Sequence, residues 1–185
     1  MHMKKTVLAA AVSIWMVGGA CGQQAYVSAA LGTSHVNLDC NGTTQCDQND
    51  SGFKLLGGLK MSTNLSLEAS YIDFGKARYE YVQGSTTIGG RLDASALTVG
   101  GALRYDFIPE FTGVLRLGMA YVTSKVDEPN AAATSHATKP YWGLGAEYAF
   151  DKNWKGVASA DFTTGKFRGT NGVVRLYSVG AQYGF

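Results

Sequence analysis

Apolar residues recur at every second position along most of the chain after residue 24. Within 96–105, one face carries Leu97, Val99, Gly101, Leu103 and Tyr105. Small or polar residues fall between them, and the same alternation returns at 114–121, 141–150 and 177–185. A period of two is typical of β-strands with two different faces, and no segment carries a convincing helical stripe. The pattern therefore predicts an all-β protein.

We predict eight strands, at 25–36, 52–60, 65–74, 94–105, 111–122, 140–150, 154–163 and 173–185. Three connections are short, at 61–64, 106–110 and 151–153. Four are long and polar, at 37–51, 75–93, 123–139 and 164–172. The strict alternation of long and short connections indicates an antiparallel up-and-down meander with all short turns at one end. That asymmetry is typical of a transmembrane β-barrel with short periplasmic turns and long extracellular loops.

The second face of the predicted strands carries charges at the strand centres, on Lys54, Glu68, Arg104, Arg116, Glu147, Lys155 and Asp161. An eight-stranded barrel has an interior only just wide enough for side chains, so small and polar residues fit it better than bulky aromatic ones. We therefore place the charges in the lumen and the apolar face against lipid. Unpaired charges there would be costly, so we predict a salt-bridged plug, with Glu68 pairing with Arg104 and Arg116 with Glu147.

Aromatic residues gather near both ends of the predicted strands. One group lies at the short-turn end and comprises Tyr105, Phe107, Phe111, Phe150, Trp154, Tyr183 and Phe185. The other lies toward the long connections and comprises Tyr71, Phe74, Tyr121, Tyr141, Trp142, Phe162 and Tyr177. Two aromatic girdles around an aliphatic band are expected where rings lie at the depth of lipid headgroups.

Residues 1–22 have the pattern of a cleaved secretory signal, with Lys4 and Lys5 before a short apolar stretch and small residues after it. Cleavage after Gly22 or after Ala20 fits, and lipidation of Cys21 is an alternative. We expect one mature domain, 23–185. Without the two leader lysines the chain has fourteen basic and fourteen acidic residues, so its charge does not favour nucleic acid as a partner.

Cys40 and Cys46 lie close together in the first long connection. In an oxidising compartment we predict a disulfide between them, because a zinc site would need more cysteine or histidine ligands than His35 alone. The same connection holds five oxygen-bearing residues that could bind Ca²⁺, namely Asp39, Asn41, Asp47, Asn49 and Asp50. It lacks the glycine and glutamate of an EF-hand loop, so we favour a solvated loop. No metal or cofactor is predicted.

Two runs carry a resemblance to a known family: AYVSAALG at 25–32 and LEASYIDFG at 67–75. They resemble the first and third strands of OmpA/OmpX-like eight-stranded outer-membrane β-barrels. The terminal alternation through Tyr183 and Phe185 is similar to the signal that the barrel-assembly machinery recognises in that family. The resemblance implies the bacterial outer membrane, with membrane lipid and lipopolysaccharide as neighbours. The chain stops at Phe185 without the peptidoglycan-binding domain of many OmpA-type proteins, so we expect no direct cell-wall tether.

These expectations favour a monomeric, non-enzymatic barrel that supports membrane integrity, adhesion or recognition of a host or surface ligand through its loops. A small porin-like channel for solutes or ions is the alternative. A lipid-modifying enzyme is the third, because His35 lies beside Ser34 and near Asp39, and His136 lies in another long connection. Two isolated histidines beside common residue types are a weak signal of catalysis.

Overall fold

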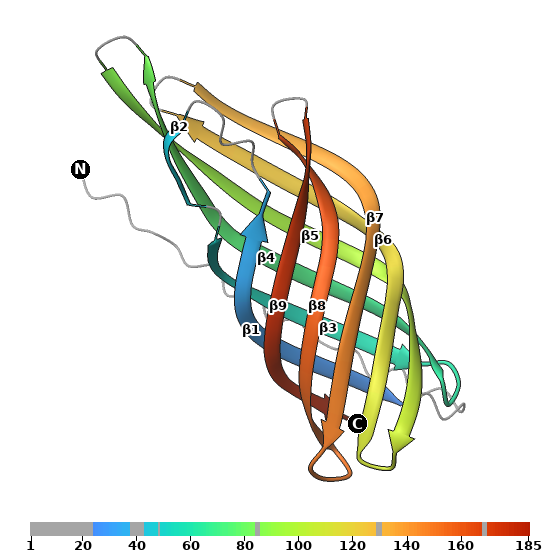
Figure 1. Ribbon diagram of the computed structural model, residues 1–185. Helices are drawn as coiled ribbons and strands as arrows, with labels where there is room; N and C mark the ends of the chain where they lie inside the picture. The colour runs from blue at the N-terminus through green and yellow to red at the C-terminus, as the bar shows by residue number, and fades with distance from the viewer. Residues whose placement is uncertain (1–23, 38–42, 48, 84–85, 129–130, 168–169) are drawn as a thin grey trace, which may run out of the picture.

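The computed structural model describes residues 24–37, 43–47, 49–83, 86–128, 131–167 and 170–185 (Figure 1). These residues form one antiparallel sheet with the strand order β2-β4-β3-β1-β9-β8-β7-β6-β5. A further pairing of β4 with β5 closes the sheet, so eight strands form a barrel and the short β2 lies outside it, paired only with β4. The predicted closed, up-and-down eight-stranded barrel is confirmed.

The strands are β1 (Ala25–Val36), β2 (Thr43–Asp47), β3 (Asn49–Lys60), β4 (Leu65–Gln83), β5 (Thr86–Ile108), β6 (Phe111–Glu128), β7 (Ala131–Ala149), β8 (Trp154–Phe167) and β9 (Thr170–Gly184). Each predicted strand lies within an observed barrel strand, except that the predictions 140–150 and 173–185 each run one residue past the ends of β7 and β9. Within the described part of the chain, no helix has the length and hydropathy needed to cross a membrane.

Most of the predicted long connections are strand rather than loop. Strands β4 and β5 stay paired out to Gln83 and Thr86, and β6 and β7 out to Glu128 and Ala131. We call the paired parts of β4–β5, β6–β7 and β8–β9 beyond the barrel body the ribbons; Figure 1 shows them projecting from the end opposite the short turns. The sequence analysis missed them because it assigned these long polar stretches to loops.

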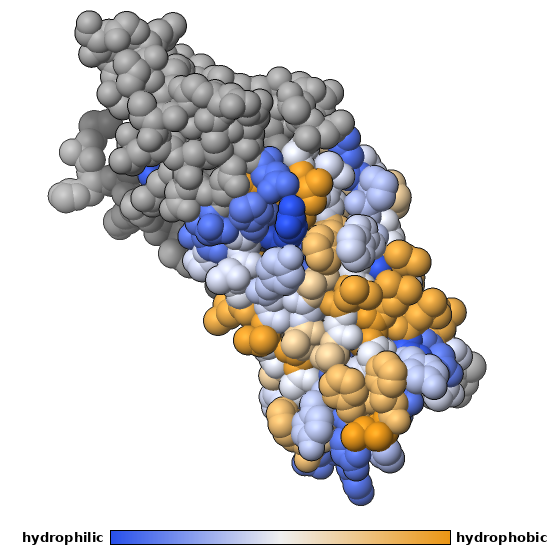
Figure 2. All heavy atoms as spheres, viewed as in Figure 1, coloured by the Kyte–Doolittle hydropathy of each residue, from blue (hydrophilic) through white to orange (hydrophobic). Residues whose placement is uncertain are grey.

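The barrel wall separates two chemically different faces. Leu97, Leu117 and Leu144 point outward, with 60%, 54% and 51% of their surface exposed. Neighbouring side chains on the same strands, such as Thr98 and Arg116, are buried in the interior. Figure 2 shows the apolar side chains as patches on the barrel body. The predicted orientation, with apolar residues outside, is confirmed.

A bulge in β4 changes the direction of the strand at the point where its ribbon begins. The register with β5 shifts between Asp73 and Lys76, and Gly75 has φ +69°. A Cβ atom there would lie 2.4 Å from the main-chain oxygen of Ser51, closer than atoms can approach. The backbone amide of Gly75 donates a 2.7 Å hydrogen bond to Asp73 Oδ1, which holds the bulge in place. Glycine is therefore required at this position on two grounds.

We expect Gly75→Val to lower the free energy of unfolding by about 1–3 kcal/mol, because a β-branched residue is strained at positive φ. Urea unfolding in lipid vesicles, followed by tryptophan fluorescence, measures the change. Gly57→Val is the matched control, since a Cβ at Gly57 meets nothing within 4 Å. Equal stability of the two variants would contradict the requirement for glycine at the bulge.

Candidate functional site: the barrel lumen

Arg104 on β5 organises the charged part of the lumen nearer the short turns. Its Nη2 atom donates hydrogen bonds to Glu68 Oε1 at 2.8 Å, Glu147 Oε1 at 3.1 Å and the Tyr26 hydroxyl at 2.9 Å. Its Nη1 atom donates to Ser66 Oγ at 2.6 Å. The guanidinium also lies 4.8 Å from the centre of the Tyr26 ring. One buried cation thus connects β1, β4, β5 and β7 across the interior.

The two glutamates extend this cluster to further strands. Glu68 accepts a hydrogen bond from the Tyr26 hydroxyl at 2.6 Å and one from Arg116 Nε at 2.7 Å. Glu147 accepts one from Lys155 Nζ at 3.0 Å. Except for Lys155, every charged group here is at least nine-tenths buried. Each carboxylate therefore has two cationic partners and is neutralised inside the barrel.

The predicted pair between Glu68 and Arg104 forms, but Arg116 does not pair with Glu147. Arg116 faces Gly143 across the β6–β7 register, while Glu147 faces Thr112. The two charges are offset by four residues, about 13 Å along the strand. Arg116 reaches across the lumen to Glu68 instead, past β5. The prediction paired Arg116 with Glu147 because their charges are opposite and their strands are adjacent. It was wrong because the depth of each side chain in the barrel depends on the strand register.

A second ion pair lies between opposite sides of the barrel. Lys54 on β3 donates to Asp161 Oδ1 on β8 at 2.6 Å. The Tyr141 hydroxyl on β7 donates to the same oxygen, and Lys54 Nζ lies 3.3 Å from that hydroxyl. Ser159 Oγ donates to Asp161 Oδ2 at 2.9 Å. The carboxylate is fully buried, and all its partners are side chains of the lumen.

The lumen toward the ribbons is filled by apolar side chains, which the sequence analysis did not foresee. This apolar plug comprises Val36, Ile72, Phe74, Leu92, Ala94, Ala96, Ala120, Val122, Tyr141, Val174 and Leu176. The predicted ionic plug therefore fills only the part of the lumen nearer the short turns. The alternation of faces along β4 could have predicted the apolar part, since Ile72 and Phe74 lie on the same strand face as Glu68.

The apolar plug also corrects the predicted upper girdle. Phe74 and Tyr141 are 1% and 6% exposed and point into the lumen. Four predicted members do point outward, namely Tyr71, Tyr121, Trp142 and Tyr177. Trp142 stacks on Phe162 with ring centres 4.1 Å apart. The positions of these rings along the chain predicted their depth in the membrane. Whether a ring faces the lumen or the lipid depends instead on whether its position along the strand is odd or even.

Comparison with known proteins agrees with this architecture. Residues 7–185 match the family model described as an outer membrane protein beta-barrel domain. The chain belongs to this family. It is therefore an outer-membrane protein, with the short turns on the periplasmic side and the ribbons on the extracellular side. No curated protein matched the chain in a sequence comparison.

Three solved structures share the fold at low sequence identity. Ail, the attachment invasion locus protein of Yersinia pestis, is 19% identical, with 88% of this chain and 99% of that one covered and a TM-score of 0.58. Neisserial surface protein A is 14% identical, with 87% and 97% covered and a TM-score of 0.60. The N-terminal β-barrel domain of Pseudomonas aeruginosa OprF is 15% identical, with 88% and 97% covered and a TM-score of 0.57.

The histidines of this outer-membrane barrel do not form a catalytic arrangement with the predicted serine. Ser34 Oγ is buried and donates to the Phe74 main-chain oxygen, while His35 lies on the opposite strand face. His35 Nδ1 and Nε2 each lie 2.8 Å from an asparagine oxygen, those of Asn49 and Asn37. His136 stacks on Tyr121 with ring centres 5.5 Å apart. Asp39 lies outside the described residues.

Several sequence predictions fall on parts of the chain that are not described. They include the leader, 1–22, and Cys40, so the cleavage site and the Cys40–Cys46 disulfide stay predictions. Asp39 and Asn41 of the Ca²⁺ alternative are also outside. Among the side chains that the structure does describe, no group of three or more His, Cys, Asp or Glu is placed to hold a metal ion.

The C-terminal aromatic residues lie at the seam where β9 meets β1. The backbone amide of Phe185 donates to the Ala25 oxygen at 2.9 Å. The Tyr183 ring packs edge-on against Trp154 and Phe185, with ring centres 5.1 Å apart in each case. These rings lie at the periplasmic end of the wall. Their role as a signal for the assembly machinery stays a prediction.

Proposed function

We propose that this protein is a sealed, non-catalytic barrel that holds its extracellular ribbons in place for contact with a surface ligand. The observation that carries the proposal is the continuation of the barrel strands beyond the membrane. Strand β4, for example, continues from Tyr71 in the upper girdle to Gln83, roughly 40 Å of chain at the usual strand rise. Such paired ribbons extend beyond the membrane from a closed barrel, where they can contact a ligand.

The filled lumen supports a sealed barrel over the porin-like alternative. The ion pairs occupy the part of the lumen nearer the short turns, and the apolar plug occupies the part nearer the ribbons. Tyr26, Ile72 and Phe74 are at most 2% exposed, and Tyr141, Arg104 and Arg116 are 6% exposed. A hydrated ion would have to displace groups that satisfy one another's charges and hydrogen bonds.

We therefore expect planar bilayers containing the refolded protein to show no stable conductance steps. The Ile72→Ala/Phe74→Ala double variant serves as a sensitivity test, since it removes two large side chains from the apolar plug. Stable, unitary openings of the unmodified protein would contradict a sealed lumen and favour the channel.

The names of two similar structures support a surface role. One is an attachment invasion locus protein, also solved with the heparin analogue sucrose octasulfate, and the other is a surface protein. The segments 37–51, 75–93, 123–139 and 164–172 of this chain are electrically balanced, however. They carry seven basic residues, Lys76, Arg78, Arg91, Lys125, Lys139, Lys166 and Arg168. They also carry seven acidic residues, Asp39, Asp47, Asp50, Glu80, Asp93, Asp127 and Glu128. We therefore propose recognition by shape and hydrogen bonding rather than by net charge.

Shortening one ribbon at a time tests this function. Replacing 125–134 by Asn-Gly joins the paired residues Ser124 and Ser135 by a two-residue hairpin turn. Replacing 77–92 joins Lys76 and Asp93 in the same way. In a weakly adherent laboratory Gram-negative strain, we expect the full protein to increase adherence to cultured cells and at least one shortened form to lose the increase.

The shift in electrophoretic mobility between unheated and boiled samples serves as the folding control for both shortened forms. Added heparin should not compete, because the four long extracellular segments together, 37–51 included, have no net charge. Adherence that is unchanged by the full protein, or unaffected by both deletions, would overturn the proposal.

A further inference from the structure

Over its first part, strand β7 has a paired neighbour on one side only among the residues that the structure describes. From Ala131 onward it pairs with β6, whereas its pairing with β8 begins at Trp142. Pro140 lies just before that point and has no N–H to continue the β7–β8 ladder. Beyond Phe162, β8 pairs with β9 alone within the described chain. We call residues 131–137 of β7 the free edge.

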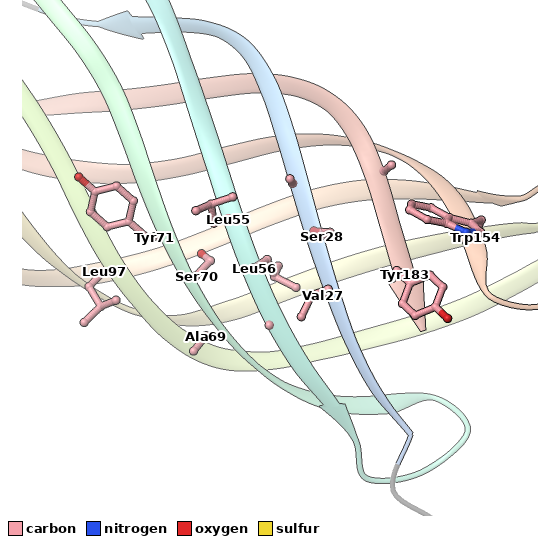
Figure 3. A pocket seen from close by; sticks show the side chains of 13 residues that line it. Val27, Ser28, Leu55, Leu56, Ala69, Ser70, Tyr71, Leu97, Trp154 and Tyr183 are labelled. Carbon is pink, nitrogen blue, oxygen red and sulfur yellow. The ribbon is translucent and has the colours of Figure 1, made fainter. Parts of the chain in front are cut away.

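The free edge differs from the rest of the sheet. In the barrel body each strand is paired on both sides; Figure 3 shows β1 there, with Val27 between Leu55 on β3 and Tyr183 on β9. Beyond the body, β4, β5, β6 and β7 continue as one extracellular sheet. Strand β2 covers part of its β4 side, where it pairs with residues 78–81. The free edge is the opposite side of this sheet, and no described strand covers it.

The alternation along β7 shows which backbone groups point out of the sheet at the free edge. The Ala149 amide donates to the Glu110 carbonyl at 2.8 Å, so odd-numbered residues of β7 direct their N–H and C=O groups toward β6. The Pro140 carbonyl, at an even position, points the other way, toward β8. The β6–β7 register has no shift. Thr134 and His136 therefore present their N–H and C=O groups at the free edge.

The free edge lacks the usual protection against a second strand. Exposed edges are commonly protected by lysine, proline or a bulge. Here Lys139 and Pro140 lie next to β8, at the base of the extracellular sheet, and the register with β6 shows no bulge. Along the edge itself, Thr134, Ser135 and Ala137 are small and uncharged. Neither bulk nor charge at these positions opposes another strand.

The chemistry of the edge and its orientation on the cell indicate a partner. An unpaired edge binds an extended strand through main-chain hydrogen bonds. Proteins generally hide such edges, but every copy of this chain carries one. Two copies in one membrane have the same orientation, so their β7 strands run parallel. Two copies on facing cells are inverted relative to each other, so their free edges run antiparallel and match about a two-fold axis. Antiparallel pairing is the more stable of the two.

We propose that the free edge joins two copies of this chain on facing cells into one continuous antiparallel sheet. The inference rests on the proposed function, because it names a second copy of the chain as a surface ligand of the ribbons. One pairing of so short a segment is weak. Many copies on each of two cells combine their contacts, so that the cells aggregate.

Aggregation of cells with short lipopolysaccharide tests the proposal. Two populations of the weakly adherent strain are labelled with different fluorescent proteins, and the protein is expressed in both, in one or in neither. We expect the fraction of cells in mixed aggregates to rise about fivefold or more when both populations express it, because many edges then act together. Expression in one population should leave the other population out of the aggregates.

A pair of matched variants separates edge pairing from other contacts. Ala132→Pro/Thr134→Pro removes two N–H groups from the free edge and keeps the ladder with β6, because both positions are even. We expect it to return aggregation to the level of cells without the protein. Ala132→Val/Thr134→Val is the control; it keeps both N–H groups and should aggregate like the unmodified protein. The mobility shift on boiling verifies that both variants fold.

Three results would overturn the self-pairing: no aggregation by the unmodified protein, equal aggregation by the proline and valine variants, or aggregates that recruit cells without the protein. The last would assign the edge to a different partner. Adherence to cultured cells is measured separately with the same strains. Adherence without aggregation would overturn the self-pairing and leave the proposed function standing, whereas loss of both would overturn both.

Discussion

Arg104→Met is expected to lower the free energy of unfolding by about 3–5 kcal/mol, the usual cost of removing one partner from a buried ion pair. The substitution keeps most of the aliphatic volume but removes the cation that Glu68 and Glu147 share. Glu147 would keep only Lys155, whose side chain is 24% exposed, and Glu68 would keep only Arg116. Two buried carboxylates would thus each lose a partner.

Equilibrium unfolding in urea, with the protein in lipid vesicles and tryptophan fluorescence as the signal, measures this loss. The matched control is Arg91→Met, the same substitution at an exposed arginine on the same strand. Its effect should remain within about 0.5 kcal/mol, as is usual at the surface. If the two variants unfold at the same urea concentration, the Arg104 cluster does not stabilise the barrel.

Asp161→Ala is expected to destabilise the barrel by a similar amount, about 3–5 kcal/mol, because it leaves the ammonium of Lys54 without its carboxylate. The Tyr141 hydroxyl would remain as a neutral neighbour of Lys54, and it cannot replace a charge. In contrast, the double variant Lys54→Met/Asp161→Leu removes both charges and should recover most of the lost stability.

Comparing the wild type with the Lys54→Met, Asp161→Leu and double variants forms a double-mutant cycle that measures the coupling between the two charges. We expect a coupling of about 2 kcal/mol or more, well above the 0.2–1 kcal/mol that is typical of exposed pairs. Asp151→Ala in an exposed periplasmic turn is the single-site control for Asp161→Ala. Additive effects in the cycle would show that the buried pair contributes no specific interaction.

The Arg104 cluster, the Lys54–Asp161 pair and the apolar plug together fill the lumen, but with different kinds of contact. The part nearer the short turns uses charges that connect strands that are not paired with each other, such as β3 with β8 and β4 with β6. The other part uses ordinary apolar packing directly beneath the ribbons. A base packed in this way resists deformation, which suits a barrel that presents ribbons on the cell surface.

The sequence alone determined the strands and their two faces. Strict period two at positions such as 96–105 requires β-structure, and the width of a small barrel requires the bulky face to point outward. Parity also placed Lys54 and Asp161 inside the lumen. These conclusions follow from local geometry, because each side chain's face depends only on its position along its own strand.

Tertiary structure decided the depth and the partners of each side chain. Arg116 contacts Glu68 rather than Glu147 because the strand register fixes depth, and no residue on β6 encodes that offset. The ribbons were missed because their polar sequences were assigned to loops, and only the pairing with a neighbouring strand makes them β-structure. Ala29, Gly57, Ala69 and Ala181 are small outward residues on four strands, and they become neighbours only when these strands pair. Contacts between distant strands depend on the closed register, which a pattern read along one strand does not contain.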